Sequence, residues 1–333
     1  TGSTNLAFAF DANAGATRTG TVTVAGRTLR VVQAGAAYVA ANPLTTLLSS
    51  LSTPSCTAAD TAGNVYVCDY DNAVIQKWSV SDQTFRTLII PGLNKPFGVA
   101  VDAVGNLYVA DIGDNTIKKW DAATGILTTL ISSGLTYPTS AGVDTVGNVY
   151  VADFMDNAIK KWNVATSNLT TLVSDVMYPM SLTVEGPNAV IFTYANSDYN
   201  WRVGAWKISS GEYIADIWTN MPAIFFWSPL TVAVSPQSGY LYAADYGSGT
   251  FYWQEGDAKH HWTHDGNWTN ISVSATSPST LAATGTGTLY FTDSTDLTLR
   301  KWTQTGTSGS VPTGTTSVLA SPLVSSPHGL AVD

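Results

Sequence analysis

Acidic side chains recur at two fixed kinds of position in this chain, and carboxylates are ligands that Ca²⁺ prefers. One set ends short apolar runs: Asp69, Asp111, Asp153, Asp245 and Asp293. The other set precedes glycine-containing turns: Asp60, Asp102, Asp144 and Glu185. A short acceptor at a strand end usually binds backbone amides of a turn. We therefore expect structural acids and no cofactor, with a Ca²⁺ site in the second set as the alternative.

The histidines could bind a transition metal only where they cluster. In "HHWTH", His260, Trp262 and His264 would share one face of a strand, although surface histidines are the favoured reading. The sequence contains no Gly-x-Ser-x-Gly, no phosphate-binding loop and no His-Glu-x-x-His. We leave enzymatic activity open and favour a role other than catalysis.

Aromatic residues gather near the turns, where flat apolar rings with polar edges could bind a sugar ring or a peptide side chain. The predicted ligand-binding residues are Tyr137, Tyr178, Tyr199, Trp201, Trp227 and Tyr246. The alternative is packing between neighbouring structural units, which we favour for rings at repeated positions, such as Tyr70 and Phe154.

An internal repeat predicts the strands that position these residues. Trp78, Trp120 and Trp162 are each 42 residues apart, a period typical of four-stranded propeller blades. Degenerate copies follow around Trp206, Trp253 and Trp302, which gives six complete copies.

Each copy contains four short apolar runs, "GVAVD", "NLYVAD", "TIKKW" and "ILTTLI" in the second, each long enough for a strand and too short for a helix. One such sheet cannot bury both faces alone, so the copies must stack. We predict an all-β fold, a six-bladed propeller of four-stranded blades. A seven-bladed ring is the alternative, because "LTTLLS" at 44–49 matches an outer strand and "SPHGLAVD" from Ser326 an inner one.

Residues 53–173 closely match a pattern of proline, "GVAVD", "GNLYVAD" and "N-x-I-x-K", and in this they resemble the NHL-repeat family. Similar propellers include lactonases, amidating lyases and streptogramin lyases. The resemblance therefore implies a second candidate function, a metal-assisted lyase or hydrolase at the propeller channel. In those enzymes acids or histidines converge on the channel, and His328 is the only histidine in a predicted inner strand here.

Residues 1–38 contain "ATRTGTVTVAGRTLRVVQAG", which resembles the second half of a BACON-type immunoglobulin-like module. We predict two domains: a partial β-sandwich segment at 1–38 and the propeller at 39–333. The BACON resemblance implies a surface or carbohydrate context. Unpaired strands at both ends suggest a third candidate function, self-assembly as the subunit of a surface fibre or larger complex.

Composition narrows the partners. Only 12% of residues are charged and the net charge is −9, without the basic clusters that nucleic acid requires. No apolar run reaches the roughly 18 residues of a membrane span. Cys56 and Cys68 face each other across a predicted hairpin, as a disulfide or as small buried residues in a reducing compartment.

Together these patterns predict an extracellular or cell-surface protein of the kind that bacteria export. Its leading candidate function is that of a binding or scaffold module, which presents an aromatic propeller face to a protein or a glycan.

Overall fold

The computed structural model describes residues 18–24, 27–33, 54–82, 84–88, 91–215, 217, 230–234, 241–245, 251–254, 269–271, 273, 275, 277–284, 288–293, 298–308, 311–320 and 330–332. The chain divides into two compact units, Thr1–Thr45 and Thr46–Asp333. In the first unit, β1 (Arg18–Val24) pairs antiparallel with β2 (Arg27–Gln33), within the segment predicted to be a partial β-sandwich. The rest of that segment, residues 1–17, 25–26 and 34–38, and the predicted outer strand at 44–49 lie outside the described residues.

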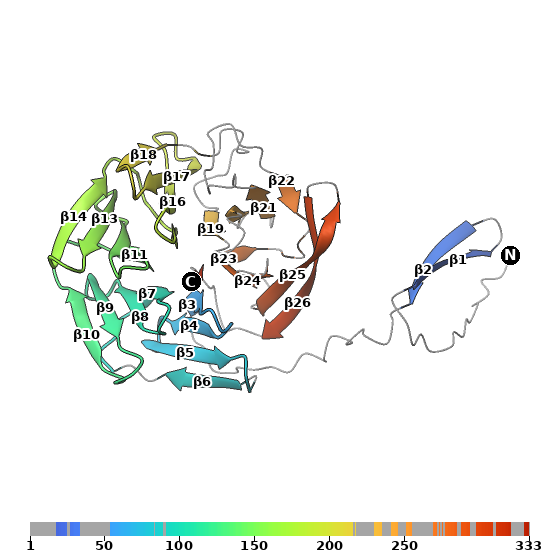
Figure 1. Cartoon of the computed structure of the whole chain (residues 1–333), viewed down its shortest axis with the longest axis horizontal. Helices are drawn as coiled ribbons and strands as arrows, with labels where there is room; N and C mark the ends of the chain where they lie inside the picture. Colours follow the sequence, from blue (N-terminus) through green and yellow to red (C-terminus); the bar gives the residue numbers. More distant parts are fainter. Residues whose placement is uncertain are drawn as a thin grey trace. The chain divides into compact units, whose positions relative to one another are not determined.

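The second unit is a β-propeller, whose sheets are arranged around a central axis (Figure 1). Blade 1 contains β3 (Pro54–Ala59), β4 (Val65–Asp69), β5 (Val74–Ser79) and β6 (Thr84–Leu88). Blade 2 contains β7 (Pro96–Val101), β8 (Leu107–Asp111), β9 (Thr116–Trp120) and β10 (Leu127–Ile131). Blade 3 contains β11 (Pro138–Val143), β12 (Val149–Asp153), β13 (Ala158–Asn163) and β14 (Asn168–Val173).

The later blades repeat this order. Blade 4 contains β15 (Leu182–Glu185), β16 (Ala189–Ala195), β17 (Trp201–Lys207) and β18 (Glu212–Ile214). Blade 5 contains β19 (Leu230–Val234), β20 (Leu241–Asp245), β21 (Phe251–Gln254) and β22 (Thr269–Ile271). Blade 6 contains β23 (Pro278–Thr284), β24 (Thr288–Asp293), β25 (Thr298–Ser308) and β26 (Val311–Ala320). The predicted all-β propeller of four-stranded blades is confirmed.

The C-terminal strand β27 (Leu330–Val332) joins the two ends of the propeller. It pairs parallel to β3, with Leu330 opposite Thr57 and Val332 opposite Ala59, so the sheet of blade 1 has five strands. A seventh blade would use these residues as its own inner strand, whereas here they extend blade 1. β27 also contacts the inner strands β7, β15, β19 and β23, and therefore lies along the axis of the ring.

Buried apolar side chains pack between neighbouring blades. Between blades 1 and 2, for example, Tyr66, Val99 and Leu107 belong to one buried cluster. The inner strands approach closely at Gly98, where an added Cβ would lie 2.6 Å from the carbonyl oxygen of Thr139. The core is thus a series of seams between sheets, which explains why one blade alone is not a stable unit.

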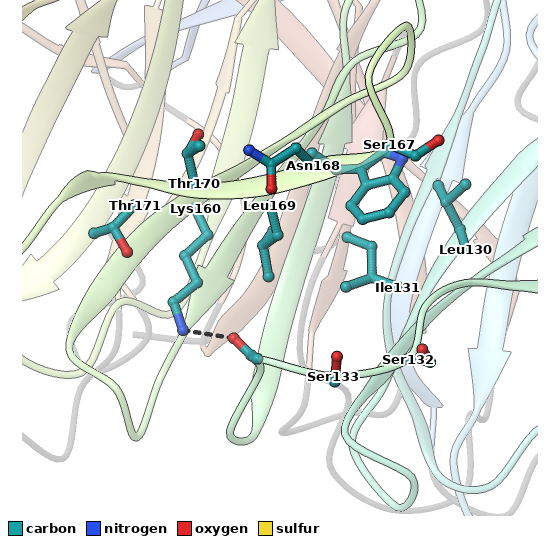
Figure 2. Close-up of a pocket in the computed structure, with 12 residues that line it drawn as sticks. Leu130, Ile131, Ser132, Ser133, Lys160, Ser167, Asn168, Leu169, Thr170 and Thr171 are labelled. Carbon is teal, nitrogen blue, oxygen red and sulfur yellow. Dashed lines mark hydrogen bonds between the residues drawn. The ribbon is translucent and has the colours of Figure 1, made fainter.

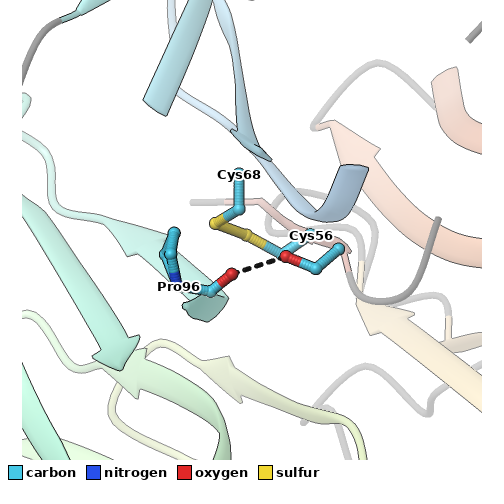
Figure 3. Close-up of a disulfide and its surroundings, with 4 residues drawn as sticks. Cys56, Cys68 and Pro96 are labelled. Atoms are coloured by element: carbon cyan, nitrogen blue, oxygen red, sulfur yellow. Dashed lines mark hydrogen bonds between the residues drawn. A yellow bond between two sulfur atoms is a disulfide. The ribbon is translucent and has the colours of Figure 1, made fainter. Parts of the chain in front are cut away.

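The first two strands of blade 1 are linked covalently. Cys56 and Cys68 are opposite each other in the ladder and form a disulfide, with their Cα atoms 5.0 Å apart (Figure 3). Beside it, the Ser55 hydroxyl donates a 2.6 Å hydrogen bond to the carbonyl oxygen of Pro96 in blade 2. Among the described residues, no helix is long and apolar enough to cross a membrane.

Candidate functional site

Five half-buried aromatic side chains form a continuous row across blades 1 to 4, which we call the aromatic arc: Tyr70, Phe97, Tyr137, Phe154 and Tyr178. They come from repeated positions. Tyr70 and Phe154 directly follow the aspartate that ends the second strand of a blade, and Tyr137 and Tyr178 directly precede the proline before an inner strand. The arc therefore lies at the end of the propeller where the inner strands begin.

Consecutive rings of the arc are in contact. The centroid distances from Tyr70 to Tyr178 are, in order along the arc, 6.3, 6.5, 5.8 and 5.0 Å. The ring planes are inclined to one another by 80°, 51°, 54° and 36°. These are the edge and tilted contacts that aromatic quadrupoles prefer. The rings consequently form a row of inclined faces rather than one flat platform.

A repeated β-bulge explains the position of Phe97. The register shifts by one residue near the start of the inner strand, between Pro54 and Cys56 in blade 1 and between Pro96 and Gly98 in blade 2. Blade 3 has the same shift at Thr139, whose hydroxyl lies 2.9 Å from the Pro179 carbonyl oxygen of blade 4. A bulge redirects the extra side chain. In blade 2 that side chain is the phenyl ring of Phe97, which joins the arc.

The backbone holds the tyrosines in an uncommon conformation. Lys95, Tyr137 and Tyr178 have φ values of 61°, 62° and 51°, in the left-handed region that costs a non-glycine residue about 1–3 kcal/mol. Specific hydrogen bonds offset this strain. The Tyr137 amide donates to Oδ1 of Asn115 at 2.8 Å, and the Tyr178 amide donates to Oδ1 of Asn157 at 3.0 Å. Each asparagine thereby fixes the loop that enters the next blade.

In blades 2 and 3, a buried lysine binds the loop that enters that blade. In blade 3, the Nζ of Lys160 donates to Oδ2 of Asp153 at 2.6 Å, to the Gly134 carbonyl oxygen at 2.7 Å and to Asp156. The Asp153 side chain is fully buried and also accepts the Thr136 amide at 2.8 Å. Blade 2 repeats this arrangement, because the Nζ of Lys118 donates to Asp111, Asp114 and the Gly92 carbonyl oxygen.

One cation lies at the arc. The Nζ of Lys95 is 5.5 Å from the ring centroid of Tyr70, within the range of a cation–π contact. Burial raises the pKa of the Tyr137 hydroxyl, the nearby Tyr70 raises it further, and Lys95 partly opposes both effects. Tyr70, Tyr137 and Lys95 therefore form one electrostatically connected group.

The predicted ligand-binding residues lie in different environments in the structure. Tyr137 and Tyr178 belong to the arc. Tyr199 lies at the turn between β16 and β17 and is 51% exposed. Trp201 was predicted to bind a ligand from a position near a turn, but it begins β17, is 3% exposed and packs in the buried cluster between blades 4 and 5.

Two predicted residues, Trp227 and Tyr246, lie outside the described residues. Sequence analysis also missed Lys95. The signal that could have found it is its register, because Lys95 precedes Pro96 as Tyr137 precedes Pro138.

The recurring acids have the structural roles that were predicted, with one difference. Asp144 accepts the amides of Val146 and Asn148 with Oδ1, and Nδ2 of Asn148 and the Tyr150 hydroxyl with Oδ2. Asp60 and Asp102 repeat this set, so all three cap the turn that follows. Asp153, by contrast, binds the loop that precedes its blade.

Glu185 replaces the capping aspartate in blade 4. Its side chain is 5% exposed, and burial raises its pKa to about 7 although Asn188 partly opposes the shift. Among the described residues, no group of three or more acids, histidines or cysteines is arranged to hold a metal ion. The carboxylates of Asp60, Asp102, Asp111, Asp144 and Asp153 are bound to turns, loops and lysines of the propeller itself.

Comparison with known proteins shows the fold alone. No protein-family model matches the chain, and no curated protein matches its sequence. Among solved structures, a streptogramin B lyase matches with a TM-score of 0.61 and 16% sequence identity, over 85% of this chain and 89% of the lyase. Virginiamycin B lyase from Staphylococcus aureus matches with a TM-score of 0.59 and 16% identity, over 87% of this chain and 92% of the lyase.

A third similar structure comes from a nidogen/laminin complex. It matches with a TM-score of 0.58 and 16% identity, over 69% of this chain and 85% of the matched chain. These similar structures are propeller proteins with different roles, and at such low identity they carry no information on residues.

Proposed function

We propose that this chain is an extracellular binding module whose aromatic arc binds a polypeptide partner. The observation that carries the proposal is the unbroken contact of five rings, 5.0 to 6.5 Å apart, over blades 1 to 4. Tyrosine is enriched among the residues that dominate binding energy at protein interfaces. The disulfide between Cys56 and Cys68 supports an oxidising compartment.

The tilt between the rings favours a polypeptide over a glycan. A sugar ring stacks best on a broad exposed aromatic face, whereas the planes of Tyr70 and Phe97 meet at 80° and those of Tyr137 and Phe154 at 54°. Inclined rings offer both faces and edges to aliphatic or aromatic side chains. Lys95 at the edge of the arc adds a preference for an acidic residue in the partner.

The arc is also rigid, which lowers the entropy lost on binding. Its backbone is fixed by the asparagine hydrogen bonds to Tyr137 and Tyr178, and by the Lys118 and Lys160 contacts beneath the loops. A surface held in this way in the free protein needs little rearrangement to bind. The nidogen/laminin complex provides a propeller of similar fold in a protein complex.

The other candidate functions have weaker support. Two similar structures are lyases, and a lyase or hydrolase working at the channel would need acids or histidines to reach it. β27 occupies the axis of the ring, and the described acids Asp60, Asp102 and Asp144 are bound to their own turns. The fibre hypothesis requires free strand edges at the chain ends, whereas β27 pairs with β3.

A peptide library displayed on phage and selected against the whole chain tests the proposal. We expect enriched peptides with two apolar or aromatic residues and an acidic residue. Tyr137→Ala should weaken their binding at least tenfold, because a central interface tyrosine contributes about 2 kcal/mol or more. Val104→Ser is the matched control: Val104 is 76% exposed in a turn at the other end of blade 2. Peptides that bind Tyr137→Ala as well as the original chain, or the lack of any enriched motif, would refute the proposal.

A further inference from the structure

A groove of about 500 Å³ lies between the outer strands of blades 2 and 3 (Figure 2), and no ring of the aromatic arc lines it. Its volume is within the range of about 300–1,000 Å³ typical of small-molecule sites. Exposed hydroxyl and amide side chains line it on both sides: Ser132, Ser133, Ser167, Asn168, Thr170 and Thr171. Its apolar part comes from half-buried Leu130, Trp162 and Leu169.

The repeat provides an internal comparison for this groove. At the register positions of Ser132, Ser133, Ser167 and Asn168, the seam between blades 1 and 2 has Ile90, Pro91, Gly125 and Ile126. The tryptophan, the leucine and the two threonines of the outer strand are the same in both seams. The seam between blades 2 and 3 thus differs from the seam between blades 1 and 2 by four polar residues. Because both seams share the same backbone pattern, the fold itself does not require these residues.

The groove carries no available charge. Lys160 is its only ionisable lining residue, and its three N–H groups donate to Gly134, Asp153 and Asp156. Figure 2 shows the first of these bonds as a dashed line from Lys160. A charged ligand would therefore find no opposite charge within the lining. The next seam differs in this respect, because it has Asp175 and Glu212 at the register positions of Ser133 and Asn168.

The hydroxyl groups remain available to a ligand. Ser132, Ser133, Ser167 and Asn168 are exposed, and their side chains make no hydrogen bond within the described residues. Thr170 differs, since its hydroxyl is 3.4 Å from the carbonyl oxygen of Lys161. Donors and acceptors on both walls, with an indole and two leucines between them, match a molecule that has hydroxyl groups around its rim and C–H groups on its face.

We propose that this groove binds a neutral oligosaccharide, with the C–H face of a pyranose ring against Trp162, Leu130 and Leu169 and its hydroxyl groups bonded to the serines and Asn168. The site is separate from the aromatic arc, so it stands independently of the polypeptide partner proposed above. The chain would then have two binding surfaces of different chemistry.

The test begins with the whole chain on an array of neutral oligosaccharides of glucose, mannose, galactose and xylose, with oligogalacturonate as the charged comparison. A sugar that binds is then titrated by calorimetry. We expect a neutral hexasaccharide to bind, and the double variant Ser167→Gly/Asn168→Ile to lower its affinity at least fivefold. Both new residues occur at the same register in blade 2, so the backbone tolerates them.

Two control variants locate the binding. Ile126→Asn makes the reverse change one blade earlier and should leave the affinity unchanged, as should Tyr137→Ala in the arc. The proposal is overturned by the lack of any neutral ligand, by preferential binding of oligogalacturonate, or by an affinity that survives Ser167→Gly/Asn168→Ile. Loss of binding in Tyr137→Ala would also overturn it, since the sugar would then occupy the arc.

Discussion

Glu185 ends the inner strand of blade 4, where its buried environment favours the protonated form of the carboxyl group. Blades 2 and 3 have an aspartate here that accepts a tyrosine hydroxyl, Tyr150 in blade 3, whereas blade 4 has Ile191 at the register of that tyrosine. Burial therefore dominates and raises the pKa of Glu185 from 4.5 to about 7. Replacing it by glutamine removes the ionisation and keeps the size and shape of the side chain.

The magnitude follows from the pKa. Each pKa unit corresponds to about 1.4 kcal/mol, so ionised Glu185 lowers the free energy of unfolding by about 3 kcal/mol at pH 8 relative to the neutral form. Between pH 4.5 and 7 the folded state binds this proton more tightly than the unfolded state. The original chain should thus lose this stability as the pH rises through that window, and lose no more of it above pH 8.

Chemical denaturation at pH 5 and pH 8 measures the effect. We expect Glu185→Gln to unfold at a higher denaturant concentration than the original chain at pH 8, and the difference to shrink or vanish at pH 5. The difference between variants isolates Glu185 from the other groups that titrate in both proteins. A variant that is no more stable at pH 8, or whose stability varies with pH as much as that of the original chain, would refute the reasoning.

Asp144→Asn is the matched control in blade 3. Asparagine keeps Oδ1 as an acceptor for the amides of Val146 and Asn148, but places an NH₂ group against the Nδ2 donor of Asn148. A buried donor without its acceptor costs about 1–3 kcal/mol. This variant should therefore be less stable at pH 8, opposite in sign to Glu185→Gln.

Two further predictions concern the contact of Lys160 with Asp153 and the pairing of β27 with β3. Lys160→Met leaves fully buried Asp153 without its cation and should lower the free energy of unfolding by about 3–5 kcal/mol, with a smaller loss in acid where Asp153 is protonated; an unchanged denaturation midpoint at pH 8 would contradict this. The amides of Leu330–Val332 should exchange hydrogen faster than those of β8, because only three residue pairs hold β27 on β3; mass spectrometry of peptic fragments measures both, and equal protection would contradict it.

The repeat predicted much of the fold because its copies are nearly identical where they are strongest. The runs "GVAVD", "NLYVAD", "TIKKW" and "ILTTLI" correspond to β7, β8, β9 and β10 within a residue or two. Within one blade, the repeat period and the length of each apolar run are enough to predict where the four strands lie. The pairing of β27 with β3 is set by closure of the ring, and two separate segments of sequence carry no sign of it.

The candidate site was predictable residue by residue but not as a surface. Tyr137 and Tyr178 stand out by type, whereas the contact of their rings with Phe154 depends on loops from different blades meeting. Trp201 was predicted to lie near a turn and bind a ligand, whereas β16 and β17 extend to seven residues each and Trp201 is buried at the start of β17. Added length alone does not say whether a strand or its turn has grown.

The joining of β27 to β3 also orders the folding of the chain. Leu330 and Thr57 are 273 residues apart in sequence, whereas Cys56 and Cys68 in the neighbouring ladder are 12 apart. Closing the longer loop costs about 3 kcal/mol more in chain entropy by the logarithmic law for flexible loops. We therefore expect blades rich in short-range pairs to form first, with the folding nucleus within them rather than at the junction of β27 and β3. On this argument the ring closes late, when β27 pairs with β3 and joins the two partly folded ends of the propeller.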